Sequence, residues 1–156
     1  MKLSTKGRYA MIALLDIALA KESTPISLAQ IATRQGISLV YLEQLFVKLR
    51  KTGIVRSVRG MKGGYVIGRS AETIRVLEIL EAVDENVDTR KSGQGASFKT
   101  TGTKAQSLSN HLWKSLATHV YVFLHNLRLS DVLENSLQPC PALEDFLSID
   151  EDAMVE

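Results

Sequence analysis

Cysteine, long apolar runs and a leader-like start are all scarce or missing in this sequence of 156 residues. The single cysteine, Cys140, rules out an internal disulfide framework and fits a reducing compartment. The longest apolar run, residues 9–20, is interrupted by Asp16 and is too short to span a bilayer. Because the first residues do not resemble a cleavable secretion signal, we expect a cytoplasmic protein with no membrane partner.

Acidic residues are rare in the first part of the chain. Residues 1–69 contain twelve Lys or Arg but only Asp16, Glu22 and Glu43 as acids, which gives a formal charge of +9. Residues 70–156 carry the opposite balance, −7. A basic half of this kind predicts a polyanionic partner, nucleic acid or an anionic membrane, although chance segregation of charge is the alternative.

Two short helices are predicted within the basic half. Ser27 can cap a helix at 28–35 that ends at a glycine, and Ser38 can cap a longer helix at 39–52. An earlier helix at 5–20 is apolar nearly all round and should be buried. Two helices joined by a tight glycine-containing turn are typical of a helix-turn-helix, whose second helix reads DNA.

The longer of the two helices has two contrasting faces. Its predicted core stripe is Leu42, Leu45, Phe46 and Leu49, which recur with helical spacing. The opposite face carries Val40, Glu43, Gln44, Val47 and Lys51. Glutamine can pair with adenine, glutamate can accept from cytosine N4, and valine suits thymine methyl groups. We therefore expect this face to contact base edges, with a solvated polar face as the alternative.

The stretch VRSVRGMKGGYVIG, residues 55–68, predicts a hairpin with a basic, glycine-rich tip. Strands are expected at 54–58 and 64–67, and the tip glycines allow positive φ. A phosphate-binding P-loop is excluded because its Gly-Lys-Ser/Thr motif leads into a helix, whereas these glycines lead into a strand. A basic hairpin after a helix-turn-helix predicts a winged helix, mainly α with a small β-hairpin wing, and double-stranded DNA as the partner.

The second half predicts a helix at 74–83, then a linker, a long helix and a tail. The linker is rich in Gly, Ser, Thr and Lys, which is typical of a long loop. The stripe of the long helix is wider than one small domain can cover, so we expect a dimerisation helix, with intramolecular packing as the alternative. The expected division is a DNA-binding domain at 1–85, a loop at 86–107, a dimerisation region at 108–135 and an acidic tail at 136–156.

Three segments together resemble a known family: KLSTKGRYAMIALLDIA, LAQIATRQGISLVYLEQLFVKLRKTGIVRSVRGMKGGYVIG and ILEAVDENVD. They are similar to the bacterial iron–sulfur cluster regulators typified by IscR, and the similarity resumes at LSNHLWKSL. The resemblance implies a homodimeric winged-helix transcription regulator, often a repressor of iron–sulfur cluster assembly genes. It also implies a 2Fe-2S cluster held by three cysteines and one histidine before the long helix.

The sequence departs from this family at the cluster ligands. Ser107 and Asn110 stand where the family has its last cysteine and its histidine, and His111 is one residue late. Serine and asparagine are poor ligands for iron–sulfur centres. Three explanations stay open: the protein senses differently, the thiols have been replaced, or Cys140 and a histidine such as His111 from two subunits hold a cluster by another scheme. His119 and His125 do not share a ligand spacing and are expected to be surface or packing residues.

The candidate DNA-contacting residues combine base readers with phosphate contacts. They are Lys2, Lys6, Arg8, Val40, Tyr41, Glu43, Gln44, Val47, Lys48, Arg56, Arg59 and Lys62. Arg59, at the wing tip, is suited to a narrow A·T-rich minor groove. The sequence contains no combination of residues typical of an enzyme. The alternatives to a transcription regulator are a winged-helix module that binds protein or RNA, and a cluster carrier with incidental DNA affinity.

Overall fold

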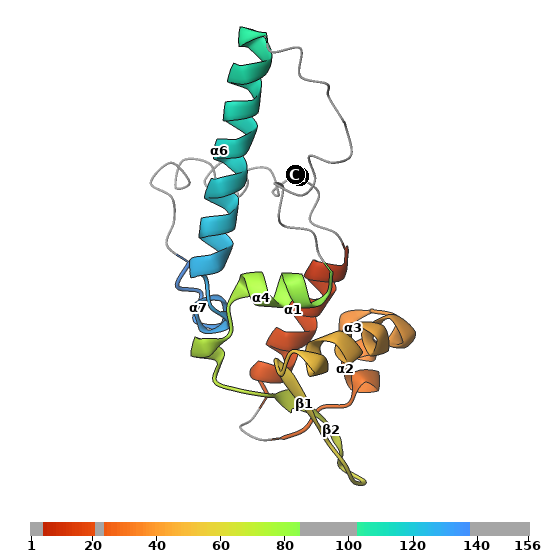
Figure 1. Ribbon diagram of the computed structural model, residues 1–156. Helices are drawn as coiled ribbons and strands as arrows, with labels where there is room; N and C mark the ends of the chain where they lie inside the picture. Colours follow the sequence, from red (N-terminus) through yellow and green to blue (C-terminus); the bar gives the residue numbers. More distant parts are fainter. Residues whose placement is uncertain (1–4, 21–23, 85–102, 138–156) are drawn as a thin grey trace, which may run out of the picture.

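The computed structural model of the chain describes residues 5–20, 24–84 and 103–137. Within these ranges the fold is mainly helical, with one two-stranded antiparallel hairpin. The hairpin projects from one end of the helical body and the longest helix, α6, rises from the opposite end (Figure 1). The mainly α architecture with a small hairpin wing agrees with the sequence-based expectation.

Most of the expected elements occur close to their expected positions. The helices are α1 Thr5–Ala18, α2 Leu28–Gln35, α3 Leu39–Lys51, α4 Val76–Ala82, α6 Lys104–Asn126 and α7 Leu129–Leu133, with a 3-10 turn, η1, at Ala71–Thr73. The strands are β1 Val55–Val58 and β2 Gly64–Ile67. The main difference is α6, which starts inside the segment expected to be loop. The hydroxyl of Thr103 accepts a bond from the Gln106 backbone N–H at 3.3 Å and caps this start.

The turn between α2 and α3 is built by a capping box and a left-handed glycine. Ser27 Oγ accepts from the Gln30 backbone N–H at 3.2 Å, and Gln30 Oε1 accepts from the Ser27 backbone N–H at 3.0 Å. Gly36 ends α2 at φ 64° and donates to the Ala32 carbonyl. Ser38 differs from expectation, because it precedes α3 but its side chain makes no capping bond. The start of α3 therefore depends on the packing of its buried face.

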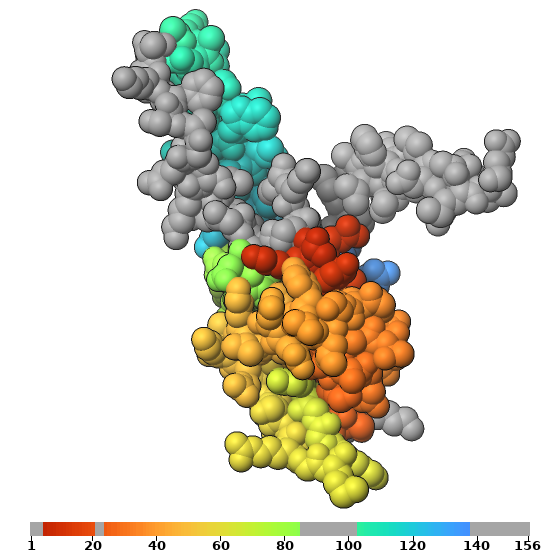
Figure 2. Space-filling view, turned by 90° about the vertical axis from the view of Figure 1, so that its right-hand side faces the viewer, coloured from red at the N-terminus to blue at the C-terminus, as the bar shows by residue number. Residues whose placement is uncertain are grey.

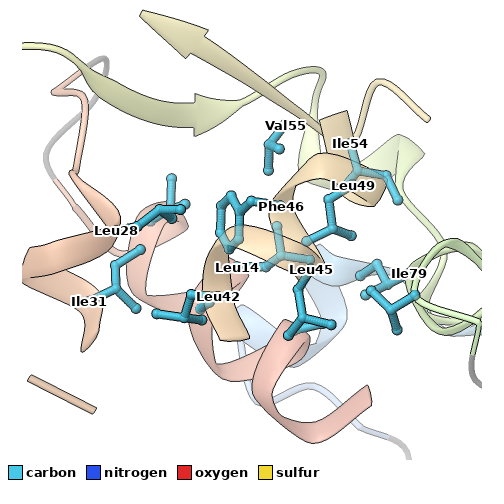
Figure 3. Packing of buried hydrophobic residues seen from close by; sticks show 14 of the residues in the cluster. Leu14, Leu28, Ile31, Leu42, Leu45, Phe46, Leu49, Ile54, Val55 and Ile79 are labelled. Carbon is cyan, nitrogen blue, oxygen red and sulfur yellow. The ribbon is translucent and has the colours of Figure 1, made fainter. Parts of the chain in front are cut away.

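The hydrophobic core is centred on α3. Phe46 is completely buried, and the other members of the expected core stripe, Leu42, Leu45 and Leu49, are buried with it. Leu14 from α1 and Ile31 from α2 pack into the same cluster, together with residues of β1 and α4 (Figure 3). Helix α1 contributes to the same core through its contacts with α2, α3, α4 and β2.

The hairpin is attached to the body by a backbone bridge and an aromatic contact. Ile26 and Tyr65 exchange two backbone hydrogen bonds, of 3.1 and 2.8 Å. The ring of Tyr65 meets the ring of Phe46 edge-on, with centroids 4.9 Å apart. A Cβ atom on Gly64 would lie 2.5 Å from the backbone of Ile26, so only glycine permits this close approach.

The base of α6 is tied to the winged-helix part by backbone bonds. Val76 donates to the Leu127 carbonyl at 2.9 Å, and Leu129 donates to the Ile74 carbonyl at 2.8 Å. A second apolar cluster around Leu80 packs α4 against the last turns of α6. Burial alone would raise the pKa of Glu78 beside this junction. Bonds from the Arg75 backbone and the Arg69 side chain outweigh that effect and lower the pKa.

We predict that Gly64→Ala destabilises the protein by roughly 1–3 kcal/mol, because the added methyl group must displace backbone rather than a flexible side chain. Urea unfolding followed by circular dichroism measures the change. Met61→Ala on the same hairpin is the matched control, since Met61 is fully exposed and its removal should leave the midpoint unchanged. Equal midpoints for Gly64→Ala and the unchanged protein would contradict the close approach.

Candidate nucleic-acid interface

The outward face of α3 carries both polar and apolar side chains, and it is exposed because the opposite face packs into the core. Val40 and Val47 are 62% and 46% exposed, and Glu43 and Gln44 between them are also exposed. Exposed valines are unusual on a helix face that only meets water, because they gain nothing there. These four side chains are accessible to a partner, and their contact with base edges stays a prediction.

The hairpin extends the surface of the two short helices. Figure 2 shows the orange and gold surface of α2 and α3 continuing into the projecting yellow hairpin. Arg56, Arg59 and Lys62 are all exposed there, with the methionine between them. A projecting tip with three cations can reach a groove that the body of the protein cannot enter.

The glycines of the hairpin tip differ in their roles. Of the three tip glycines, Gly60 alone has positive φ, 121°, a conformation that the glycines were expected to allow at the tip. Gly63 donates to the Gly60 carbonyl at 2.9 Å and closes the turn. A Cβ atom on Gly63 would lie 2.5 Å from the Val58 carbonyl oxygen, so it is needed for close approach.

The first turn of α1 lies beside α3 and brings further positive charge to this surface. Tyr9 meets Tyr41 edge-on, with ring centroids 5.7 Å apart and planes at 89°. Tyr41 is half-buried by this contact, whereas Lys6 and Arg8 are exposed. Lys2 lies outside the described residues. The tyrosine pair fixes where the start of α1 sits relative to the outward face of α3.

Three lysines converge on a shallow hollow between α1 and α3. The hollow has a volume of about 440 Å³ and is lined by Lys6, Lys48 and Lys51 together with Gln44 and Tyr41. Lys48 donates from Nζ to Oδ2 of Asp84, which lies two residues after the end of α4. The bond and charge of Lys48, and then the charge of Lys6, lower the pKa of the Asp84 carboxyl.

Comparison with known proteins identifies the family. The Rrf2 family, described as iron-dependent transcriptional regulators, matches residues 3–135. The chain belongs to the Rrf2 family. It is 58% identical over 155 residues to the HTH-type transcriptional regulator IscR of Cereibacter sphaeroides, a match that covers 97% of this chain and 100% of that protein. It is 49% identical over 136 residues to IscR of Escherichia coli strains, covering 86% of this chain and 82% of theirs.

Solved structures of Rrf2 regulators share the fold. CymR of B. subtilis, the global cysteine regulator, superposes with a TM-score of 0.72 at 30% identity over 86% of this chain and 98% of that one. IscR of T. potens superposes with a TM-score of 0.63 at 34% identity, over 90% of this chain and 93% of that one. The chain is therefore a DNA-binding transcription regulator with a winged-helix fold. Its relatives are regulators rather than enzymes, in agreement with the sequence-based expectation.

This Rrf2 chain does not carry the cluster ligands that the family resemblance implied. Ser107, Asn110 and His111 are all exposed on the first turns of α6, and Cys140 lies outside the described residues. Within 5–20, 24–84 and 103–137, no three His, Cys, Asp or Glu side chains are grouped as a metal site. Hydroxyl and amide groups do not replace thiolates on an iron–sulfur centre. The residues present do not fit three-cysteine, one-histidine ligation.

The other histidines of α6 are engaged in local contacts. His119 Nδ1 lies 2.8 Å from the Ser115 carbonyl oxygen. His125 stacks on Tyr121, and its Nε2 lies 2.7 Å from an Arg75 guanidinium nitrogen. The arginine donates, so Nε2 of His125 is the acceptor. Both histidines act in packing or at the surface, as their spacing indicated.

The two ends of the α6 apolar stripe have different surroundings. Toward its C-terminal end, Tyr121, Leu124 and Leu127 pack against α4. Toward its N-terminal end the apolar side chains are exposed, with Leu112 at 60% and Trp113 at 61%. The expected dimerisation stripe therefore divides into an intramolecular part and an exposed part. None of the described helices is both long and apolar enough to cross a membrane.

Two residues of the interface were not found by sequence reasoning. Asp84 is 36 positions from Lys48, and no spacing rule connects an acid after one helix with a lysine on another. Met61 was noted only as part of the hairpin, although its complete exposure between cations makes it the outermost apolar group there. The available signal was the place of Met61 at the tip of the predicted hairpin, between Arg59 and Lys62.

Proposed function

We propose that this Rrf2 protein acts as a homodimer that represses iron–sulfur cluster assembly or iron-responsive genes from two-fold related DNA half-sites. The observation that carries the proposal is the outward face of α3, with Val40, Glu43, Gln44 and Val47 exposed beside a basic wing. The IscR relatives are transcriptional regulators, which supports regulation, and the iron dependence of Rrf2 regulators supports a response to iron. Action in the cytoplasm is part of the same proposal.

In the proposed complex, α3 occupies the major groove and the hairpin reaches the neighbouring minor groove. Gln44 pairs with adenine, Glu43 accepts from cytosine N4, and the two valines contact thymine methyl groups. Arg59 enters a narrow A·T-rich minor groove, where the negative potential is strongest. The candidates for phosphate contact are Lys2, Lys6, Arg8, Lys48, Arg56 and Lys62, and Tyr41 borders the same surface.

The proposed dimer forms through the exposed apolar part of α6. Exposed patches of large apolar side chains mark interaction sites on soluble proteins. Two copies related by a two-fold axis would cover each other's patch with the same residues. Such a dimer presents two α3 helices to one duplex, about one helical turn apart or a multiple of it.

The domain division follows the same scheme. Residues 1–85 form the DNA-binding part, 86–107 link it to the dimerisation region at 108–135, and 136–156 form an acidic tail. Helix α6 starts at Lys104, so the linker is shorter than its sequence composition indicated. Cys140 and His111 are the candidates for unusual ligation if a 2Fe-2S cluster binds.

A winged-helix module that binds protein or RNA is the alternative, as is a cluster carrier. The basic surface supports any of these, but the valines among the polar groups of α3 favour base contacts in a duplex. A gel shift with a specific operator and a scrambled duplex separates the regulator from both alternatives. An absorbance band after anaerobic purification supports either the carrier or a regulator that senses through a cluster.

We predict that Glu43→Ala weakens binding to a site with cytosine opposite Glu43 by roughly 1–3 kcal/mol. Binding to scrambled duplex should stay equal or tighten, because a negative charge leaves the interface. Titrations of both duplexes by fluorescence anisotropy at two salt concentrations measure the change. Glu72→Ala, an exposed acid outside α3, is the control for net charge. An equal loss on both duplexes would assign Glu43 to the fold instead of base reading.

Gln44→Ala should lower affinity only for sites with its preferred base.

We predict that Leu116→Glu converts a dimer into a monomer, because it places a charge within the exposed apolar part of α6. Light scattering at micromolar concentration measures the mass. Thr118→Glu is the matched control, since Thr118 is exposed and points about 200° away around the helix. A wild-type protein that is monomeric both alone and on DNA would refute the dimer.

We predict that binding to at least one class of site does not require a cluster. The physical reason is the lack of thiols at the family's ligand positions. The test compares metal-free protein with anaerobically reconstituted protein on one operator. An absolute requirement for reconstitution would contradict the prediction. If an absorbance band does form, Cys140→Ser should remove it, and a band that survives would exclude Cys140 as a ligand.

A further inference from the structure

Asp84 lies beside the surface proposed to meet DNA, although it belongs to a different element from the candidate contacts. It follows the last turn of α4, and α4 contacts α3 directly. Its carboxylate accepts a hydrogen bond from Nζ of Lys48, on the side of α3 that faces the hollow. The side chains of Lys48 and Asp84 are 37% and 69% exposed, so a phosphate group of bound DNA can reach the pair.

The backbone holds Asp84 in an unusual conformation that fixes its position. Its φ is 57°, in the left-handed region that non-glycine residues rarely adopt. Its N–H donates to the Glu81 carbonyl at 3.1 Å, which closes the end of the helix. Aspartate and asparagine tolerate this conformation better than most residues. The carboxylate is therefore directed by the end of α4 and does not depend on a long flexible side chain.

Asp84 interacts with more than one of the candidate phosphate contacts. The pKa of its carboxyl is lowered first by the bond and charge of Lys48 and also by the charge of Lys6, so it is ionised at neutral pH. Lys6 and Lys48 both line the hollow between α1 and α3, with Lys51 as a third cation. One carboxylate thus balances part of the positive charge at this end of the surface.

We propose that Asp84 is a positioning residue that withholds Lys48 from DNA phosphates and so limits sequence-independent affinity. Each phosphate that a lysine neutralises releases counterions and strengthens binding to every duplex alike. A lysine already paired within the protein adds no such contact unless the pair breaks. This inference rests on the proposed DNA interface and extends it to an acid that lies outside α3.

The inference changes the expected behaviour of Lys48. If Lys48 met a phosphate in the unchanged protein, Lys48→Ala would flatten the salt dependence by about one unit of slope. With Asp84 holding it, Lys48→Ala leaves the slope nearly unchanged. Asp84→Asn releases Lys48 and steepens the slope by about 0.9, the value for one added phosphate contact.

The test is a double-mutant cycle on a scrambled duplex and on a specific operator. Binding constants of the unchanged protein, Asp84→Asn, Lys48→Ala and the double variant are measured by anisotropy over a range of salt. Asparagine keeps the size of the side chain and tolerates the left-handed φ, so urea unfolding should show a folded variant. We expect Lys48→Ala to flatten the slope only in the Asp84→Asn background.

Glu81→Gln is the matched control for net charge. Glu81 is exposed on α4, three residues before Asp84, and makes none of the ion pairs among the described residues. An equal change of slope for Glu81→Gln and Asp84→Asn would reduce the effect to the general field and overturn the proposal. An effect of Lys48→Ala that is the same with and without Asp84 would overturn it too.

Failure of this inference can be told apart from failure of the proposed interface. If the interface is wrong, the unchanged protein does not distinguish operator from scrambled duplex, and Lys62→Ala, at a candidate phosphate contact of the hairpin, leaves the salt slope unchanged. If only the role of Asp84 is wrong, discrimination persists and Lys48→Ala flattens the slope by about one unit in the unchanged protein.

Discussion

The arrangement of the candidate DNA-binding surface depends on the burial of Phe46. Its ring is completely enclosed at the centre of the core, on the inner face of α3. Residues three and four apart lie on the same side of an α-helix. Once one side of α3 is buried, the residues on its opposite side must therefore face solvent. Val40 and Glu43 point outward for this reason. The same ring receives the edge of Tyr65, so the position of the hairpin depends on the core that orients α3.

Sequence patterns predicted the elements whose signals are local. The helical spacing of Leu42 to Leu49 predicted the buried face of α3, and Ser27 predicted the start of α2, where the structure adds Gln30 to form a capping box. Each of these signals acts within about four residues, the reach of a helix turn. Ser38 looked equally suitable as a cap, but packing determined the start of α3 and its hydroxyl makes no capping bond.

Sequence patterns did not predict the contacts that join distant segments. The approach of Gly64 to Ile26 and the pairing of Lys48 with Asp84 depend on how whole elements pack. A glycine in the hairpin could equally provide a left-handed turn, and composition does not distinguish the two uses. Likewise, a wide apolar stripe shows that α6 is covered on several sides. It does not show that Leu127 packs within the chain while Leu112 stays exposed.

The positive charge of the basic half favours DNA binding, but a selective regulator must also limit its affinity for DNA of any sequence. A surface with many lysines and arginines binds any duplex, and the competing sites in a genome far outnumber an operator. Specificity is a difference of affinities, so it grows when unwanted binding is weakened. Glu43 meets base edges directly in the proposed complex, and an unsuitable base leaves its carboxylate without a donor. Asp84 would not contact DNA itself but would act through Lys48, by limiting the contact of this lysine with phosphates. A regulator with so basic a surface can thus gain selectivity from two acids placed next to its cations.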